Sequence, residues 1–170
     1  MSVIPWPLNP SSRAQPAAAR ASAPDDVAGL AAALSQSRQT ILPKRLGGPG
    51  PSAEELAQIL QAAAHAPDHG QLLPWRFILV PQAARPPLAD VFAQALLERD
   101  PTATAEQAEQ AREKAFRSPV LLLAVVDAEL GDAEIDLAER TISAGCAVQN
   151  MLLMATAQGY GSALTSGKAL

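Results

Sequence analysis

The sequence predicts one domain that combines several helices with a small buried sheet. Two short apolar runs, at residues 75–80 and 120–126, have the length and composition of buried strands. Longer segments around them repeat apolar residues at helical spacing. The 170 residues are enough for one domain of ordinary size and too few for two.

The N-terminal stretch, residues 1–24, is expected to be a disordered Ala/Pro-rich tail ahead of a domain over residues 25–170. It holds five of the 15 prolines and no acidic residue. Pro5 and Pro7 interrupt the only apolar run that could serve as a secretory signal. The arginines and missing acids leave a transit peptide as the alternative.

The domain is expected to begin with a helix that runs from Asp25 to near Gln36, because acidic residues suit a first helical turn. Residues 37–43 then predict an extended segment, since Pro43 disfavours helix at the residue before it. The glycines and prolines of residues 47–51 predict a loop.

A capped helix should follow this loop. Ser52 is a good N-cap, and Glu55 stands three residues later, as a capping box requires. The helix must stop before Pro67. The first strand comes next, between Pro74 and Pro81.

Two helices are predicted between the strands, over about residues 87–98 and 104–114, and the second is polar and largely exposed. The second strand, residues 120–126, is apolar at every position. Such a strand is typical of the middle of a sheet with both faces covered.

The last predicted helix covers about residues 135–158 and ends in a glycine cap at Gly159. Its stretch from Ala144 to Ala157 is apolar nearly all round, which indicates a core helix or one buried at a subunit interface. Cys146 lies in this stretch, where a cysteine usually acts as a small apolar residue. Two strands make a marginal sheet, so we expect that part of the fold is missing beyond the C-terminus.

Composition narrows the function classes. The net charge of −4 and the pI near 5.1 argue against nucleic-acid binding. No run reaches the roughly 18 apolar residues of a membrane-spanning helix. A single cysteine cannot form a disulfide within the chain, which favours a cytoplasmic protein.

Standard nucleotide-binding and metal-binding motifs are not matched by this sequence. Gly159-x-Gly161 closes a helix and has Leu164 where a dinucleotide fingerprint needs a third glycine. His65 and His69 have the spacing of zinc ligands, but Pro67 lies between them, so no metal site is expected. Their other interpretation is two solvated residues at a helix end.

The order of several short motifs resembles the nitroreductase family, closest to its small YdjA-like bacterial branch of NAD(P)H nitroreductases. The resemblance covers about residues 27–170. The motifs that carry it are Ser37-Arg38-Gln39-Thr40, the helix capped by Ser52, Ala66-Pro67-Asp68-His69, Pro74-Trp75-Arg76-Phe77, Ser143-Ala144-Gly145-Cys146-Ala147, and Gly159-Tyr160-Gly161 through Ser166-Gly167.

The resemblance implies an α+β fold with a central mixed sheet flanked by helices. It also implies a homodimer with FMN at the subunit interface, each site built from both chains. The residues that fall on the family's cofactor-binding positions are Arg38, Gln39 and Thr40, then Leu164, Thr165 and Ser166, and, from the partner subunit, His65 and His69. The family continues beyond the end of this chain, which would explain the small sheet.

These residue types suit FMN, because a guanidinium pairs with phosphate or with the pyrimidine edge and hydroxyls donate further hydrogen bonds. Three family arginines are nevertheless replaced here, by Gln39, His65 and Thr165. A charge-assisted hydrogen bond contributes roughly 1.5 to 3 kcal/mol, against about 1 for a neutral one. FMN should therefore bind more weakly than in relatives, unless Lys44, Arg45 or Lys168 substitutes for the lost cations.

The function that the resemblance implies is an FMN-dependent NAD(P)H oxidoreductase. Hydride would pass from NAD(P)H through the flavin to a nitroaromatic or quinone-like acceptor, with no catalytic side chain required. The alternative is a non-catalytic flavin-binding or interaction protein derived from a shortened nitroreductase.

Overall fold

The computed structural model describes residues 26–129 and 131–165. The expected N-terminal tail and Ser166, one of the expected cofactor-binding residues, lie outside the described residues. The chain divides after Ala33 into two units. All the packing discussed below lies within the second unit.

Helix α1 spans Val27–Ser37, one residue beyond its expected end. The amide of Leu30 donates to the carbonyl oxygen of Asp26 at 3.0 Å, so the helix begins beside the acidic pair, as expected. No residue of α1 is buried. The predicted helix is therefore present, and its apolar residues Val27 and Leu30 are exposed.

Helix α2, Ala53–Ala62, begins with the predicted capping box. The Ser52 hydroxyl accepts a hydrogen bond from the Glu55 amide at 3.2 Å, and Oε2 of Glu55 accepts one from the Ser52 amide at 2.8 Å. Together they satisfy two amides that a helix start leaves unpaired. A short 3₁₀ turn, Ala63–His65, ends the helix ahead of Pro67, as predicted.

The described residues form one sheet of two antiparallel strands, β1 (Trp75–Leu79) and β2 (Leu122–Val126). Trp75 pairs with Val126 at one end and Leu79 with Leu122 at the other. The prediction that the second strand has both faces covered is wrong for this part of the chain, because Leu123 is 52% exposed. An all-apolar strand needs cover on both sides, and the described residues supply too little of it.

Helices α3 (Arg85–Arg99) and α4 (Ala105–Glu113) form a hairpin that lies between β1 and β2 in the sequence. Helix α3 begins two residues earlier than expected, since prolines are tolerated in a first turn, where amides have no intrahelical partner. Apart from Arg85, the buried residues of α3, α4 and the turn that follows are alanines, which allow close approach of the helices: Ala89, Ala93, Ala111 and Ala115. An ion pair between Asp90 and Arg112 joins the two helices at the surface.

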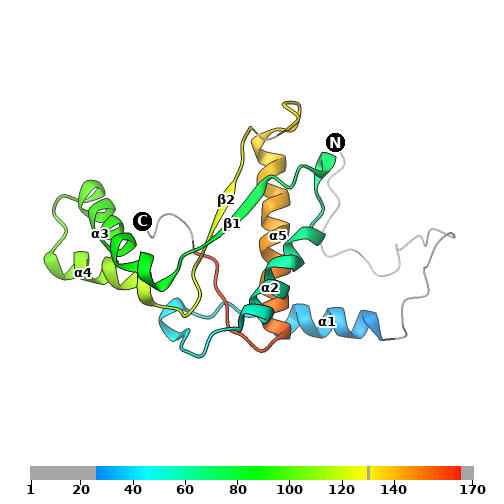
Figure 1. The fold of residues 1–170 in the computed structure, drawn as a ribbon, viewed down its shortest axis with the longest axis horizontal. Helices are drawn as coiled ribbons and strands as arrows, with labels where there is room; N and C mark the ends of the chain where they lie inside the picture. The colour runs from blue at the N-terminus through cyan, green and yellow to red at the C-terminus, as the bar shows by residue number, and fades with distance from the viewer. Residues whose placement is uncertain (1–25, 130, 166–170) are drawn as a thin grey trace, which may run out of the picture. The chain divides into compact units, whose positions relative to one another are not determined.

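Helix α5, Leu137–Ala157, is the longest element and carries the main core. Its N-cap Asp136 accepts a hydrogen bond from the Glu139 amide at 2.9 Å. Helix α2 packs beside it (Figure 1), and Trp75 and Phe77 of β1 pack against the same cluster. The cluster consists of Ile59, Ala63, Ala147, Met151 and Ala155.

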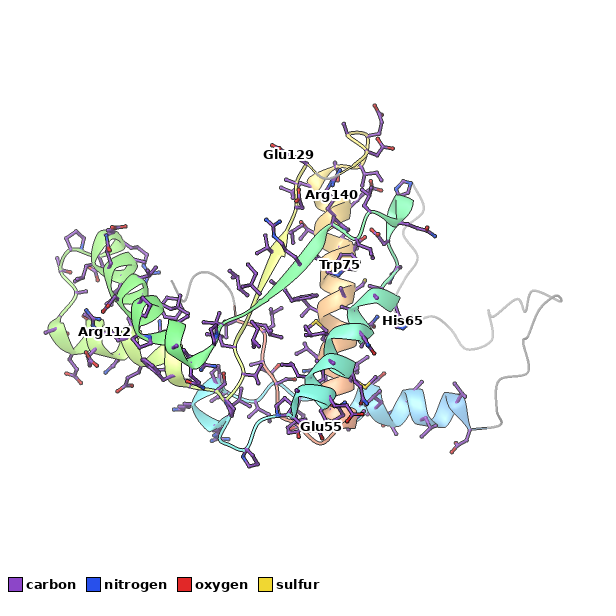
Figure 2. All side chains as sticks on the ribbon, in the orientation of Figure 1. Glu55, His65, Trp75, Arg112, Glu129 and Arg140 are labelled. Atoms are coloured by element: carbon purple, nitrogen blue, oxygen red, sulfur yellow. The ribbon has the colours of Figure 1, made fainter. Side chains whose placement is uncertain are left out.

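Two buried arginines fasten the loops around this framework. Arg85, 1% exposed, donates to the carbonyl oxygens of Ala115, Ser118 and Pro119 at 3.1, 2.6 and 3.0 Å. Arg140, labelled in Figure 2, donates to Ile135 and Asp132 carbonyl oxygens at 2.8 and 2.6 Å. The first holds the chain between α4 and β2, and the second holds the loop before α5.

Candidate functional site

The candidate site is built around the turn that ends α5. The amide of Tyr160 donates to the Ala155 carbonyl oxygen at 2.8 Å, and the amide of Gly159 donates to that of Thr156 at 3.0 Å. This is a Schellman motif, and Gly159 occupies its left-handed position with φ +83°. The glycine cap predicted from the sequence is confirmed, and it turns the chain toward the start of α2.

Side chains tie this turn to the first turns of α2. The Tyr160 hydroxyl donates to Oε2 of Glu55 at 2.9 Å, and Nε2 of Gln158 donates to Oε1 of Gln58 at 2.8 Å. The hydrogen bond from the Ser52 amide is the main cause that lowers the pKa of Glu55, and the bond from Tyr160 adds to it. Glu55 in turn raises the pKa of Tyr160, since a carboxylate favours the protonated phenol.

Beyond Tyr160 the chain runs beside the segment that follows α1. A Cβ at Gly161 would lie 3.0 Å from Cγ1 of Ile41, so the backbone at Gly161 packs closely against the Ile41 side chain. Thr40 and Ser162 form a parallel bridge, and the Ile41 amide donates to the Ser162 carbonyl oxygen at 3.0 Å. Two segments that are far apart in the sequence thus lie side by side.

The bridge sets Thr40, at the end of the Arg38 segment, beside Ser162, two residues before Leu164. Arg38 is half-buried and donates to the Thr40 hydroxyl at 3.5 Å, and no carboxylate among the described residues pairs with it. Gln39 and Thr40 are exposed, as is Thr165, and Leu164 is 66% exposed. Arg38 is therefore free to meet an anion.

The hydroxyl oxygen of Ser162 is buried and has no hydrogen-bond partner in the described part of the chain. It belongs to the bridge between the two segments. A buried hydroxyl without a partner is uncommon in proteins and requires an explanation, such as a ligand or an ordered water.

A hollow of about 510 Å³ adjoins the same turn. Arg45 is the one charged residue among those that line it within the described chain. The other lining residues are Ile41, Leu46, Gly47, Pro49, Gly50, Pro51, Ser118, Pro119, Val120, Gly159, Tyr160 and Gly161.

The histidines predicted to bind cofactor lie elsewhere. Figure 2 shows Glu55 at the start of α2 and His65 just beyond its end, so the two residues lie at opposite ends of the helix. His69 is exposed, and its Nδ1 lies 3.4 Å from Oε1 of Glu139. A single chain does not bring these histidines to the Arg38 segment.

Asp68 lies in the turn after Pro67, between the two histidines, and its Oδ2 accepts a hydrogen bond from the Leu73 amide at 2.6 Å. Within the described ranges, no group of three or more His, Cys, Asp and Glu side chains could hold a metal ion. No helix among these residues is long and apolar enough to cross a membrane.

Sequence reasoning found the capping role of Glu55 and missed its second partner. Tyr160 stands 105 positions away, and no local pattern links them. It also missed Ser162, whose hydroxyl becomes notable only once the bridge to Thr40 forms.

Comparison with known protein families gives one match over most of the chain. Residues 37–169 match the description "Nitroreductase family". The chain is 35% identical over 125 residues to the "Putative NAD(P)H nitroreductase" of Haemophilus influenzae, covering 74% of this chain and 67% of that protein. It is 34% identical over 123 residues to the protein of the same name, YdjA, from Escherichia coli K12, covering 72% and 66%. The chain therefore spans about two thirds of the length of these curated relatives.

Solved structures show the same architecture. The nitroreductase-like family protein from Bacillus cereus has a TM-score of 0.67 at 19% identity, over 81% of this chain and 70% of that one. A nitroreductase with bound FMN from Bacteroides fragilis has a TM-score of 0.55 at 19% identity, over 75% and 65%. These likenesses confirm the expected α+β fold.

Proposed function

Because this chain belongs to the nitroreductase family, we propose that it is an FMN-dependent oxidoreductase that uses NAD(P)H as its hydride donor. The names of the curated relatives and the FMN bound in a structural neighbour support this activity class. The observation in this chain that supports it best is the bridge between Thr40 and Ser162. It joins Thr40, one of the expected cofactor-binding residues, to Ser162, which lies two residues before Leu164.

The proposed cofactor site consists of Arg38, Gln39 and Thr40 on one segment and Leu164, Thr165 and Ser166 on the other. The residues present fit FMN on three grounds. Arg38 has no carboxylate partner among the described residues, the Thr40 hydroxyl lies 3.5 Å from it, and the Ser162 hydroxyl lacks a partner in the described part of the chain. A planar guanidinium is suited to either the phosphate or the pyrimidine edge.

When bound, FMN would supply the hydride transfer from NAD(P)H to a nitroaromatic or quinone-like acceptor. The side chains would bind and orient the cofactor through Arg38 and the threonine hydroxyls. Exposed Leu164 would give the apolar contact that a flavin ring needs. No side chain has to act as acid, base or nucleophile, so we assign no catalytic residue.

We further propose a homodimer in which His65 and His69 complete the partner's cofactor site. Within one chain, His65 lies at the opposite end of α2 from Glu55, and His69 lies beside Glu139 in the first turn of α5. We therefore propose that the two histidines act across an interface. The outer surface of α5 suits a second copy, since Ile142 is 68% exposed and Gly145 has open space around it. The single cysteine favours a cytoplasmic location.

A non-catalytic flavin-binding protein is the second candidate. Gln39, His65 and Thr165 stand where the resemblance leads us to expect arginines, and two of them carry no charge. With fewer charge-assisted hydrogen bonds to the cofactor, such a protein would still bind flavin but would not position it for turnover.

Absorbance of the purified full chain in the visible range tests both candidates. Flavin absorbance, together with NAD(P)H consumption in the presence of a nitroaromatic, supports the enzyme. Flavin absorbance without turnover supports the second candidate. Protein that stays colourless after incubation with FMN and gel filtration contradicts both.

A further inference from the structure

We propose that Glu55 and Tyr160 are positioning residues for the cofactor site: their hydrogen bond holds Ser162 against Thr40 and Ile41, and with it the segment that leads to Leu164 and Thr165. This inference rests on the proposed function. Neither side chain belongs to the expected cofactor-binding set, and neither is assigned a direct contact with FMN. Their role would be to fix the backbone that carries the contacts.

Glu55 is well placed to act as an anchor because it is itself held in position. The same oxygen, Oε2, accepts from the Ser52 amide at 2.8 Å and from the Tyr160 hydroxyl at 2.9 Å. The capping box therefore restricts the rotamer of Glu55 independently of the hydrogen bond from Tyr160. A carboxylate acceptor also makes this hydrogen bond stronger than a neutral one.

Tyr160 is attached at both ends. Its ring packs against the core cluster of α2 and α5, and its amide closes the Schellman turn with Ala155. Two residues later, Ser162 bridges Thr40. Because only Gly161 separates Tyr160 from Ser162, a displacement of the Tyr160 side chain would also displace Ser162 and disturb its bridge to Thr40.

The bridge has little support of its own. It is an isolated pair rather than part of a ladder, and its described backbone hydrogen bond runs from the Ile41 amide to the Ser162 carbonyl oxygen. The residues beyond it, Leu164 and Thr165, are exposed. Outside contacts must supply the order that a pre-organised binding site needs, and the bond between Tyr160 and Glu55 is one of them.

Two variants separate positioning from plain stability. Tyr160→Phe keeps the ring and removes only the hydroxyl. Ser52→Ala removes the hydroxyl that caps α2 and leaves the bond between Tyr160 and Glu55 in place. Both variants should lower the melting temperature, and only the first should loosen the bridge.

Glu55→Gln serves as the conservative rescue. At the same cap position of α4, the side-chain oxygen of Gln107 accepts from the Thr104 amide at 2.8 Å. A glutamine at 55 can thus cap α2 and still accept from Tyr160. Glu55→Ala can do neither.

The test combines amide hydrogen exchange of the cofactor-free protein with FMN titration, both on the full chain. Tyr160→Phe and Glu55→Ala should speed exchange at the Ile41 amide and weaken FMN binding about three- to tenfold, the loss of one hydrogen bond. Ser52→Ala should change neither, and Glu55→Gln should lie close to the wild type in both.

The outcomes are distinguishable. If Tyr160→Phe leaves either the Ile41 exchange or the FMN dissociation constant unchanged while the wild type binds FMN, the positioning role is wrong and the proposed function stands. An equal loss of FMN binding in Ser52→Ala also contradicts it, because helix stability alone would then explain the effect. If the wild type binds no FMN, the proposed function fails together with any cofactor role.

Discussion

The hydroxyl oxygen of Tyr160 lies 2.9 Å from Oε2 of Glu55, and this one contact joins the end of α5 to the start of α2. The hydrogen bond from the Ser52 amide is the main cause that lowers the pKa of Glu55, and the Tyr160 hydroxyl lowers it further, while Glu55 raises the pKa of Tyr160 because a carboxylate favours the protonated phenol. The junction is therefore most stable between the two titrations.

The stability of this junction should depend on pH at its acidic end. The pKa of Glu55 is lowered in the folded state, so its contribution is present above the usual value of 4.5 and is lost as the pH falls through the folded value. Urea unfolding of wild type and Glu55→Gln, compared from pH 7 to pH 3, should show a difference that shrinks as the pH falls. A constant difference between the two proteins would contradict this assignment.

Arg85→Met should destabilise the protein by about 3 kcal/mol or more, because one buried and two partly buried carbonyl oxygens lose a charged donor. The free energy of unfolding in urea measures this loss. The matched control is Arg76→Met, on the exposed side of β1, which should change stability by about 0.5 kcal/mol or less. If Arg85→Met lowers the free energy of unfolding as little as the control does, water replaces the guanidinium and the Arg85 hydrogen bonds contribute nothing to stability.

The sequence predicted the elements whose signals are local. The capping box at Ser52, the glycine cap at Gly159 and the strand between Pro74 and Pro81 depend on residues within a few positions of one another. Helix α3 was predicted to begin late, since Pro86 and Pro87 give the same signal for a loop and for a first helical turn.

Contacts between residues that are far apart in the sequence could not be predicted from local sequence patterns. Arg85 and Arg140 look like ordinary surface arginines in the sequence, and only the fold shows the carbonyl oxygens around them. For the site, residue type and order indicated the Arg38 segment and the Leu164 segment. Their side-by-side placement depends on the bridge at Ser162, which no periodicity encodes.

Arg38→Ala should weaken FMN binding by about 1.5 to 3 kcal/mol, since Arg38 is the cation kept in the first cofactor-binding segment. Fluorescence titration of FMN into the cofactor-free protein gives the dissociation constant. Arg76→Ala removes an exposed arginine outside the site and should leave it unchanged. Equal constants for Arg38→Ala and the wild type would rule out this placement of the cofactor.

Ile142→Arg should convert the proposed homodimer into a monomer. Leaving a side chain of this size in water forfeits roughly 1.5 to 3 kcal/mol, so its 68% exposure in one chain favours an interface on this face of α5. Light scattering coupled to gel filtration measures the mass. Val91→Arg, at an exposed apolar position on α3, is the control and should remain dimeric. A wild type that runs as a folded monomer and still binds FMN would contradict the shared site.

His69→Ala should weaken FMN binding while it changes stability by less than about 1 kcal/mol, because its pair with Glu139 is exposed on both sides. Glu139→Ala removes the same pair and keeps His69. This control should match His69→Ala in urea unfolding and the wild type in FMN titration.

Mixing Arg38→Ala protein with His69→Ala protein tests whether the two residues serve one site from different chains. Each homodimer has two damaged sites, whereas the heterodimer should combine both substitutions in one site and leave the other intact. After subunit exchange, the mixture should therefore regain high-affinity FMN binding, up to one site per heterodimer. Titration before and after mixing measures the recovery, and subunit exchange is followed independently with a fluorescent label on one protein. If exchange is complete and binding does not recover, Arg38 and His69 do not act across the interface. The exposed histidines at the end of α2 then have the simpler interpretation of solvated residues.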